Sequence, residues 1–431
     1  MACRHTGESG IVLVLQKKNY NNMGILNTLA LLVSLTALFS YLNVRYLRLP
    51  TTLATLLIAL LLSLGLLLLA KLGWPVLQLE AQDFLRSVTF HQDLVHGLLG
   101  FLLFAGALHI NLSDLSKHRA VIMLLAMVGV LISTLMVAGF SYWILNSLGL
   151  RIAFLYCLLF GALISATDPL AVLSILKGTG INKLLQDKVA GESLFGGAVG
   201  VVVFLVLLSL LKGGVSATPA GIAALLLQKA AGGALLGLLG GFSLCWLLRT
   251  VNHYQVEVLL TVALVMGGYA LATLLQTSGL ITVVVAGLVL GSQGRGLALP
   301  ATSREHLVQF WGLLGEVLMV LLLVLIGLEM GALNLRVEYA LAALAIIPMV
   351  LLARFGGIAI PLAALRRYRR FGPNVVEVLT WGGLRGGVAI ALALSLPLGV
   401  ERDVLLAVTY AVVVSSILVQ GLTLKYVVAG N

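Results

Sequence analysis

Charged residues are scarce in this 431-residue chain: Asp, Glu, Lys and Arg together make up only 10% of it, whereas 60% of the residues are hydrophobic. Polar stretches are short as well, and the longest interruptions of the apolar sequence lie at about 71–93, 249–256 and 292–305. They leave no room for a large soluble domain. This composition excludes an ordinary water-soluble globular protein and predicts a polytopic membrane protein.

Cysteine and catalytic motifs are also rare. The three cysteines are Cys3, Cys157 and Cys245, two of them inside apolar segments, which excludes a disulfide framework or a cysteine metal cluster. We recognise no nucleotide loop, metal triad or Ser/His/Asp arrangement, so we expect no enzyme and no cofactor. A secretory leader is not recognisable either, because residues 1–23 are apolar only over 11–15, and we predict a flexible tail there.

Apolar runs of helical length, by contrast, are abundant. Crossing the hydrocarbon takes about 20 apolar residues per helix, and the runs lack the alternation of polar and apolar residues that a barrel strand requires. We therefore predict an all-α fold, with a single transmembrane domain over residues 24–427 and about thirteen transmembrane helices. The predicted bounds are 24–44, 51–70, 94–112, 120–147, 152–176, 189–211, 219–248, 256–276, 279–292, 306–330, 337–364, 374–397 and 403–426.

The net charge of +11 is mainly a topology signal. With thirteen spans, fifteen Lys and Arg residues fall on one side of the membrane and nine on the other. The positive-inside rule places the fifteen in the cytoplasm, so the amino terminus lies outside and the carboxyl terminus inside. We therefore expect membrane lipids as partners of the chain and no nucleic acid, which would need a soluble basic face.

One acidic residue, Asp168, lies in the middle of the apolar stretch 152–176, within Ala166-Thr167-Asp168-Pro169. A charge near the bilayer centre costs at least about 2.5 kcal/mol, so such a residue usually faces a cavity or a partner. Proline removes a backbone donor and frees carbonyls that can coordinate an ion. The string predicts an intramembrane cation site with Asp168 as the metal ligand. The alternative is a buried, protonated Asp168 with a structural role.

Two further strings with polar or charged residues lie in later segments. Gly191-Glu192-Ser193 adds a carboxylate and a hydroxyl, and hard cations bind to such oxygens. The string 381–387 places four glycines and Arg385 inside segment 374–397, which predicts a broken helix. We expect the positive charge of Arg385 to offset the partial negative charge at the carbonyl ends of the broken helices. The alternative is that Arg385 is a cation in a loop without this role. Interrupted segments five and twelve, seven apart, predict two inverted repeats around a site at the membrane midplane.

In this order the strings resemble the monovalent cation:proton antiporter family, and in particular sodium/proton exchangers of the bacterial type. The resemblance covers most of the chain. The matching stretches are Ala166-Thr167-Asp168-Pro169, Gly191-Glu192-Ser193, the sequence VVAGLVLG at 284–291, Phe310-Trp311, Ile326-Gly327-Leu328-Glu329 and Gly383-Leu384-Arg385-Gly386.

The resemblance implies roles for individual residues. Thr167 and Asp168 would line the ion site at an unwound crossover, and Ser193 would add a ligand. Glu192 would pair with an arginine of the eleventh helix, which by position is Arg354. Burying two opposite charges as a pair costs less free energy than burying either one alone, which favours the pair of Glu192 and Arg354. The alternative is that the Arg354 side chain extends to the membrane–water interface.

The resemblance also implies a larger architecture. It suggests a homodimer, a mobile core made of segments at about 94–211 and 337–426, and a scaffold made of segments at about 24–70 and 219–330. The transported species would be Na⁺ or Li⁺ in exchange for H⁺, by alternating access in the bacterial inner membrane.

One departure from the family pattern bears directly on transport. The family carries Asn-Asp four and five residues after the glutamate, and the aspartate is its central ion and proton carrier; this chain has Gly196 and Gly197. Glycine offers only a backbone carbonyl, which cannot exchange a proton near neutral pH. Three interpretations stay open: an impaired exchanger that uses Asp168 alone, an exchanger fold whose transport is lost or altered, and an uncoupled channel-like or regulatory membrane protein.

Overall fold

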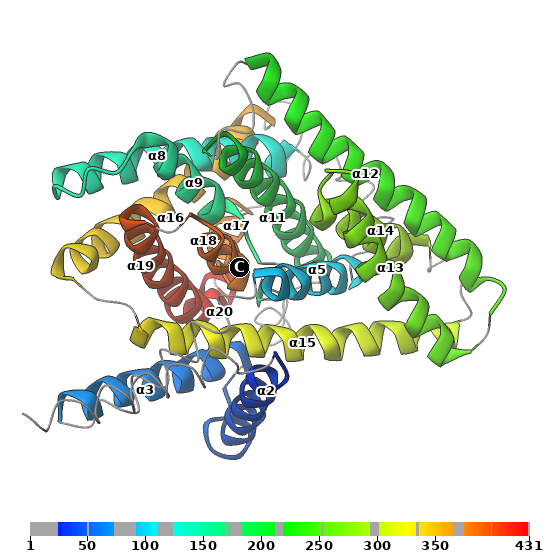
Figure 1. Cartoon of the computed structure of the whole chain (residues 1–431). Helices are drawn as coiled ribbons and strands as arrows, with labels where there is room; N and C mark the ends of the chain where they lie inside the picture. Colours follow the sequence, from blue (N-terminus) through cyan, green and yellow to red (C-terminus); the bar gives the residue numbers. More distant parts are fainter. Residues whose placement is uncertain are drawn as a thin grey trace, which may run out of the picture. The chain divides into compact units, whose positions relative to one another are not determined.

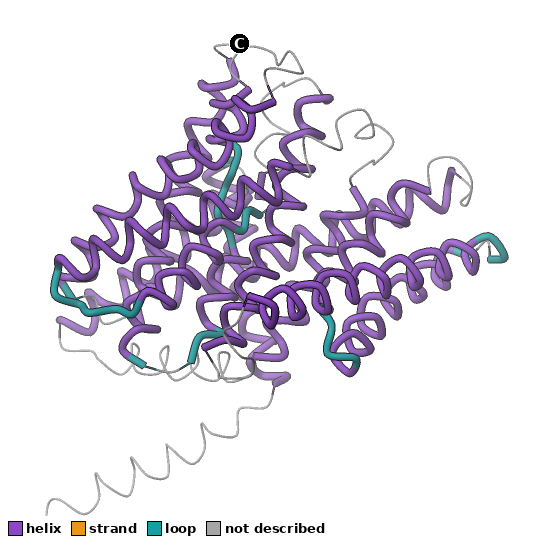
Figure 2. The backbone as a smooth tube through the Cα atoms, turned by 90° about the horizontal axis from the view of Figure 1, so that it is seen from above, coloured by secondary structure: helices purple, strands orange, loops and turns teal. Residues whose placement is uncertain are grey.

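The computed structural model describes residues 25–49, 51–72, 92–109, 124–168, 171–172, 183–211, 219–251, 253–293, 301–332, 336–365, 375–397 and 399–429. Within these ranges all regular structure is helical and there is no strand (Figure 2). Eight of the described helices are long and apolar enough to cross a membrane, and four shorter ones are apolar. The prediction of an all-α fold is confirmed. The predicted tail at 1–23 lies outside the described residues.

Each of the thirteen predicted segments overlaps one helix, one helix joined to a π-helical turn, one interrupted pair, or, in the last segment, two helices joined by a π-helical turn. The elements are α2 (Ile25–Leu42) with η1 (Asn43–Leu47), α3 (Thr51–Lys71), α5 (Gln92–His109), η2 (Leu125–Gly129) with α8 (Val130–Ser147), α9 (Phe154–Ser165), α11 (Lys183–Leu211), α12 (Pro219–Leu248), α13 (Tyr254–Leu274), α14 (Gly279–Gln293), α15 (Ala301–Ala332), α16 (Val337–Leu365), α17 (Val375–Trp381) with α18 (Gly387–Leu394), and α19 (Val400–Ser415) with η3 (Ser416–Gln420) and α20 (Gly421–Ala429).

The chain divides into two compact units. One comprises Met1–Val95 and Val320–Asn334, and in it α2 packs on α3. The other comprises His96–Met319 and Leu335–Asn431, and in it α8 packs on α9 and α16, α11 on α9, and α12 on α14 (Figure 1). All the predicted site residues belong to the second unit. The division into a core and a scaffold and the inverted repeats stay predictions.

Small residues allow the closest helix contacts of the second unit. A side-chain carbon on Gly129 in η2 would lie 2.6 Å from the carbonyl oxygen of Gly357 in α16. On α12, a side-chain carbon on Gly237 would lie 2.5 Å from the carbonyl oxygen of Thr282, in the first turn of α14. Since lipid offers no hydrophobic drive for helix association, such close backbone contacts are a main source of packing energy in membranes.

Both predicted interruptions are present in the second unit. Helix α9 ends at Ser165, and Ala166 has extended backbone angles of φ −68° and ψ 115°. Helix α17 ends at Trp381, and regular structure resumes only at Gly387, after Gly386 with φ −134° and ψ −151°. The two stretches meet, because the Asp168 amide donates a hydrogen bond of 3.1 Å to the carbonyl of Leu384. Backbone outside a helix is tolerated at membrane depth only inside protein, as here.

Candidate cation-binding site

Asp168 lies where the two interruptions meet and is only 4% exposed. Its Oδ1 accepts a hydrogen bond of 3.3 Å from the Ala171 amide. On the opposite interruption, the backbone of Gly386 lies so close that a side-chain carbon added there would overlap the Asp168 carboxylate. Glycine at 386 therefore lets the second interruption pack directly against the carboxylate.

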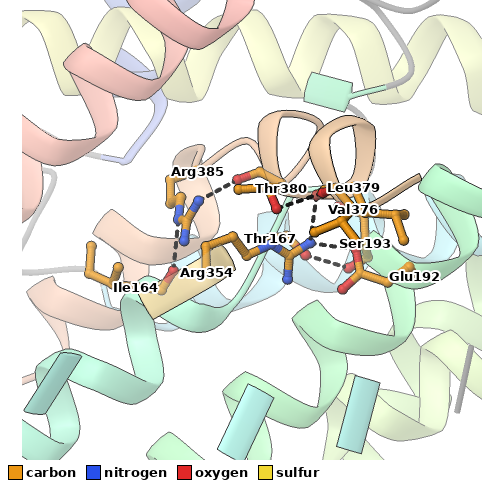
Figure 3. A network of polar contacts seen from close by, with 10 residues as sticks. Ile164, Thr167, Glu192, Ser193, Arg354, Val376, Leu379, Thr380 and Arg385 are labelled. Atoms are coloured by element: carbon orange, nitrogen blue, oxygen red, sulfur yellow. Dashed lines mark hydrogen bonds and ion pairs between the residues drawn. The ribbon is translucent and has the colours of Figure 1, made fainter. Parts of the chain in front are cut away.

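The residue before it, Thr167, connects the first interruption to α11. Its hydroxyl donates a hydrogen bond of 3.0 Å to the carbonyl of Ser193 (Figure 3). Both residues are fully buried. The Ser193 hydroxyl has no hydrogen-bond partner in the part of the chain that the structure describes. A buried hydroxyl without a partner is costly unless something else coordinates it.

Glu192 and Arg354 form a buried ion pair between α11 and α16. Arg354 Nη2 lies 2.5 Å from Glu192 Oε2, and the two side chains are 4% and 2% exposed, for Arg354 and Glu192 respectively. The same nitrogen donates to the carbonyl of Leu379 in α17 at 3.4 Å (Figure 3). The guanidinium therefore lies in the protein interior and does not extend to an interface. The second carboxylate oxygen, Glu192 Oε1, has no hydrogen-bond partner among the described residues.

Arg385 lies at the end of the broken helix α9. Its Nε donates to the carbonyl of Ile164 at 3.2 Å, and its Nη1 donates to the carbonyl of Gly383 at 2.6 Å (Figure 3). The last carbonyls of a helix have no partner within the helix, and a cation is favourable at that negative end. The Arg385 guanidinium therefore donates to backbone carbonyls of both interrupted segments, and its role in charge compensation stays a prediction.

The two glycines that replace the family's Asn-Asp face the first interruption. A side-chain carbon on Gly197 would lie 2.6 Å from the carbonyl oxygen of Thr167, which leaves no room for a side chain unless the backbone moves. One on Gly196 would lie 3.4 Å from Glu192 Oε1 and 3.5 Å from Thr167 Oγ1, which is ordinary contact distance. A neutral backbone oxygen thus occupies the space in which a side chain of residue 197 would start.

The four buried ionisable groups of the site balance one another. Asp168 and Glu192 are acidic, Arg354 and Arg385 are basic, and none is more than 4% exposed. The described residues contain no cluster of three or more His, Cys, Asp or Glu residues that could hold a metal. A cation at this site would therefore bind to carboxylate, hydroxyl and carbonyl oxygens, which suit hard monovalent ions.

The structure adds residues that sequence reasoning missed. Ser416, in the π-helical turn η3, accepts a hydrogen bond of 3.0 Å from the Arg385 amide and in turn donates to Gln420. Their sequence signal was weak: two polar residues in the last apolar run. Glu257, in the first turn of α13, is fully buried and neither of its carboxylate oxygens has a partner among the described residues. A carboxylate at the start of an apolar segment could have drawn attention to it.

Comparison with known proteins gives one family and several relatives. The model of the family described as sodium/hydrogen exchanger, transmembrane, matches residues 33–430. The chain is 45% identical over 404 residues to the Na(+)/H(+) antiporter NhaP of Pseudomonas aeruginosa, covering 93% of this chain and 95% of the relative. It is 34% identical over 357 residues to the Na(+)/H(+) antiporter NhaH of Halobacillus aidingensis, covering 81% and 86% of the two chains.

Among solved structures, the sodium proton antiporter MjNhaP1 of Methanocaldococcus jannaschii is similar. It superposes with a TM-score of 0.74 at 21% sequence identity, over 94% of this chain and 97% of that one. At this level of identity, the likeness shows that the two chains share a fold. The predicted resemblance to exchangers is thus supported at two levels, in sequence and in fold.

Proposed function

Because this chain belongs to the sodium/hydrogen exchanger family, we propose that it is a secondary-active antiporter that exchanges Na⁺ or Li⁺ for protons by alternating access. The observation that carries the proposal is the buried Asp168 carboxylate between two interrupted helices. Interrupted helices of this kind form the midplane sites of secondary transporters. Such a protein is a transporter and not an enzyme, and the ions it needs are substrates, not cofactors.

The exchange would take place at a single carboxylate. Asp168 can be neutralised by either a proton or a metal ion, and competition between the two couples their movement. Thr167 and Ser193 would supply neutral oxygens to the metal ion, while the Glu192–Arg354 pair would hold α11 against α16. Arg385 would keep the ends of the broken helices charge-compensated in both conformations.

The chain's placement in the membrane follows from the same family. It is a multi-pass membrane protein, and we place it in the bacterial inner membrane with the amino terminus outside and the carboxyl terminus in the cytoplasm. The excess of Lys and Arg residues in the loops on one side of the membrane supports this orientation. We further propose a homodimer, surrounded by lipid, as the functional unit.

One observation favours a second candidate, an exchanger fold with lost or altered transport. Gly197 removes the carboxylate that the family uses as its main ion and proton carrier. Asp168 remains, but its site holds two buried acids, Asp168 and Glu192, and two buried guanidiniums, Arg354 and Arg385, so a cation would bind in a site without surplus negative charge. The third interpretation, an uncoupled channel-like or regulatory membrane protein, stays a separate candidate.

Transport in proteoliposomes distinguishes these candidates. We expect a sodium or lithium gradient to drive proton movement, and Asp168→Asn to reduce it to the level of empty liposomes. Asp403→Asn is the matched control, because Asp403 is an exposed carboxylate in the first turn of α19 and should leave exchange unchanged. Undiminished exchange in Asp168→Asn would refute the proposed role, and cation current without proton movement would identify a channel.

A further inference from the structure

We propose that Gly196 and Gly197 make this site prefer the larger monovalent cation K⁺ over Na⁺ and Li⁺. The inference rests on the proposed function, since it concerns the ion taken by the same site. Three features of the described residues support it: the carbonyl oxygen beside Gly197 in place of a carboxylate, the side-chain oxygens of Glu192 and Thr167 beside Gly196, and the balance of charge among the buried groups of the site.

The first feature is the carbonyl of Thr167. It lies against the Cα of Gly197, where even one side-chain carbon would come within 2.6 Å of the oxygen. Gly200, one turn further along α11, packs on Ala166 in the same way, with a side-chain carbon 2.9 Å from the Ala166 Cβ. Helix α11 is thus packed directly on the extended backbone 166–168. The neutral, dipolar carbonyl oxygen of Thr167 thus takes the place of the carboxylate that an aspartate at position 197 would supply.

The second feature is a set of buried side-chain oxygens that can still accept a hydrogen bond or bind a cation. Glu192 Oε1 and the Ser193 hydroxyl are buried and have no hydrogen-bond partner in the described part of the chain. Thr167 Oγ1 gives its proton to the Ser193 carbonyl, so its lone pairs are left to accept. Glu192 Oε1 and Thr167 Oγ1 both border the space at Gly196, where a side-chain carbon would lie 3.4 and 3.5 Å from them. A buried oxygen with unused lone pairs needs a hydrogen-bond donor or a cation to interact with it.

The third feature is charge. The Glu192 carboxylate is shared with Arg354 at 2.5 Å, and Asp168 is the other acid against two guanidiniums. These four groups carry no net negative charge, so the oxygens around Gly196 and Asp168 attract a cation weakly. Weak attraction favours an ion that loses its water easily.

Ion size then decides the preference. Coulomb attraction falls as the distance grows, so a second carboxylate benefits a small ion more than a large one. For an effective dielectric constant of about 20 and a radius larger by about 0.4 Å, losing one carboxylate shifts the balance toward the larger ion by about fivefold. A small ion is also the more reluctant to shed its water. Carbonyl and hydroxyl oxygens, by contrast, are the ligands that K⁺-selective filters use.

Two measurements test the inference. The first is binding: thermal unfolding of the purified protein in LiCl, NaCl, KCl and choline chloride at equal ionic strength, since a bound ion raises the unfolding temperature. The second is exchange in proteoliposomes with the same cations. We expect stabilisation and apparent affinity to be highest for K⁺. Equal or greater effects of Na⁺ or Li⁺ on the wild-type protein would overturn the inference.

A matched pair of variants isolates the charge. Gly197→Asp and Gly197→Asn add side chains of nearly equal size against the Thr167 carbonyl, so they share the steric cost and differ in charge. We expect the aspartate variant to shift the preference toward Na⁺ by about fivefold relative to the asparagine variant. Equal selectivity of the two folded variants would refute the role of charge. If neither variant folds, the wild-type cation series decides.

The outcomes separate this inference from the proposed function. Proton exchange that is coupled to cations but lacks a K⁺ preference overturns the inference and leaves the antiporter intact. Stabilisation by K⁺ without any coupled proton movement supports the ion preference and overturns antiport. A protein that neither binds nor moves these cations overturns both.

Discussion

The buried pair of Glu192 and Arg354 allows a quantitative test of the site's architecture. An exposed ion pair contributes about 0–1 kcal/mol, because water screens it. This pair is 2.5 Å apart with side chains only 4% and 2% exposed, so removing one partner leaves an uncompensated charge in the protein interior. We expect Arg354→Met or Glu192→Met alone to lower the free energy of unfolding by about 3–5 kcal/mol.

The double variant should behave differently from the sum of the single ones. With both charges replaced by methionine, no unpaired ion remains, and the free energy of unfolding should return to within about 2 kcal/mol of the wild-type value. The assay is denaturant unfolding in detergent micelles, arranged as a double-mutant cycle. Glu338→Met is the control, since Glu338 is an exposed acid on α16, the helix of Arg354, and should change stability by no more than about 0.5 kcal/mol.

Two results would refute this reasoning. Single variants that each cost less than about 1 kcal/mol would mean that water reaches the pair and screens it. Costs that simply add in the double variant would mean that the two side chains act independently. In either case Glu192 would not hold α11 to α16 through Arg354.

Two other contacts give further predictions. Trp311→Phe removes the hydrogen bond of 3.0 Å from the buried indole to Thr261 Oγ1 and should cost about 1–3 kcal/mol in denaturant unfolding, so an unchanged midpoint would contradict the contact. Gly386→Ala places a methyl group on the Asp168 carboxylate and should reduce the initial rate of exchange strongly. Gly65→Ala on α3, where an added carbon meets nothing within 4 Å, should leave that rate unchanged, and equal rates in both variants would argue against crowding of Asp168.

The approximate position of most helices could be read from the sequence, although α11 begins at Lys183 against the predicted 189 and α15 at Ala301 against the predicted 306. Every backbone polar group within the hydrocarbon must be satisfied inside its own helix, so the length of an apolar run nearly equals the length of the helix. The interrupted segments were also readable, because Pro169 and the glycines of 381–387 act on the backbone of their own segments. The direction of the chain relative to the membrane stays a prediction from loop charges.

Pairings between distant residues were not readable from composition or spacing. Arg354 and Glu192 are 162 residues apart, and Arg385 and Ile164 are 221 apart, so no local pattern brings them together. The resemblance suggested the first pair by position, whereas the carbonyl at the end of α9 as a partner of Arg385 came from the coordinates. Ser416 was missed because a single hydroxyl in an apolar run carries no distinctive signal. Gly386 was predicted as one of the glycines that break its segment, but its contact with the Asp168 carboxylate came from the coordinates.

By itself, the sequence determined a helical membrane protein with two broken segments and a carboxylate in one break, and it predicted thirteen segments in all. These properties depend on the affinity of side chains for lipid and on local backbone geometry. Tertiary structure alone decided that the Thr167 carbonyl fills the position beside Gly197 and that Glu192 Oε1, which has no hydrogen-bond partner among the described residues, lies beside Gly196 together with the Thr167 hydroxyl. Those contacts depend on how closely α11 packs on the non-helical backbone at Ala166 and Thr167. Helix packing sets this distance, and the sequence of no single segment encodes it.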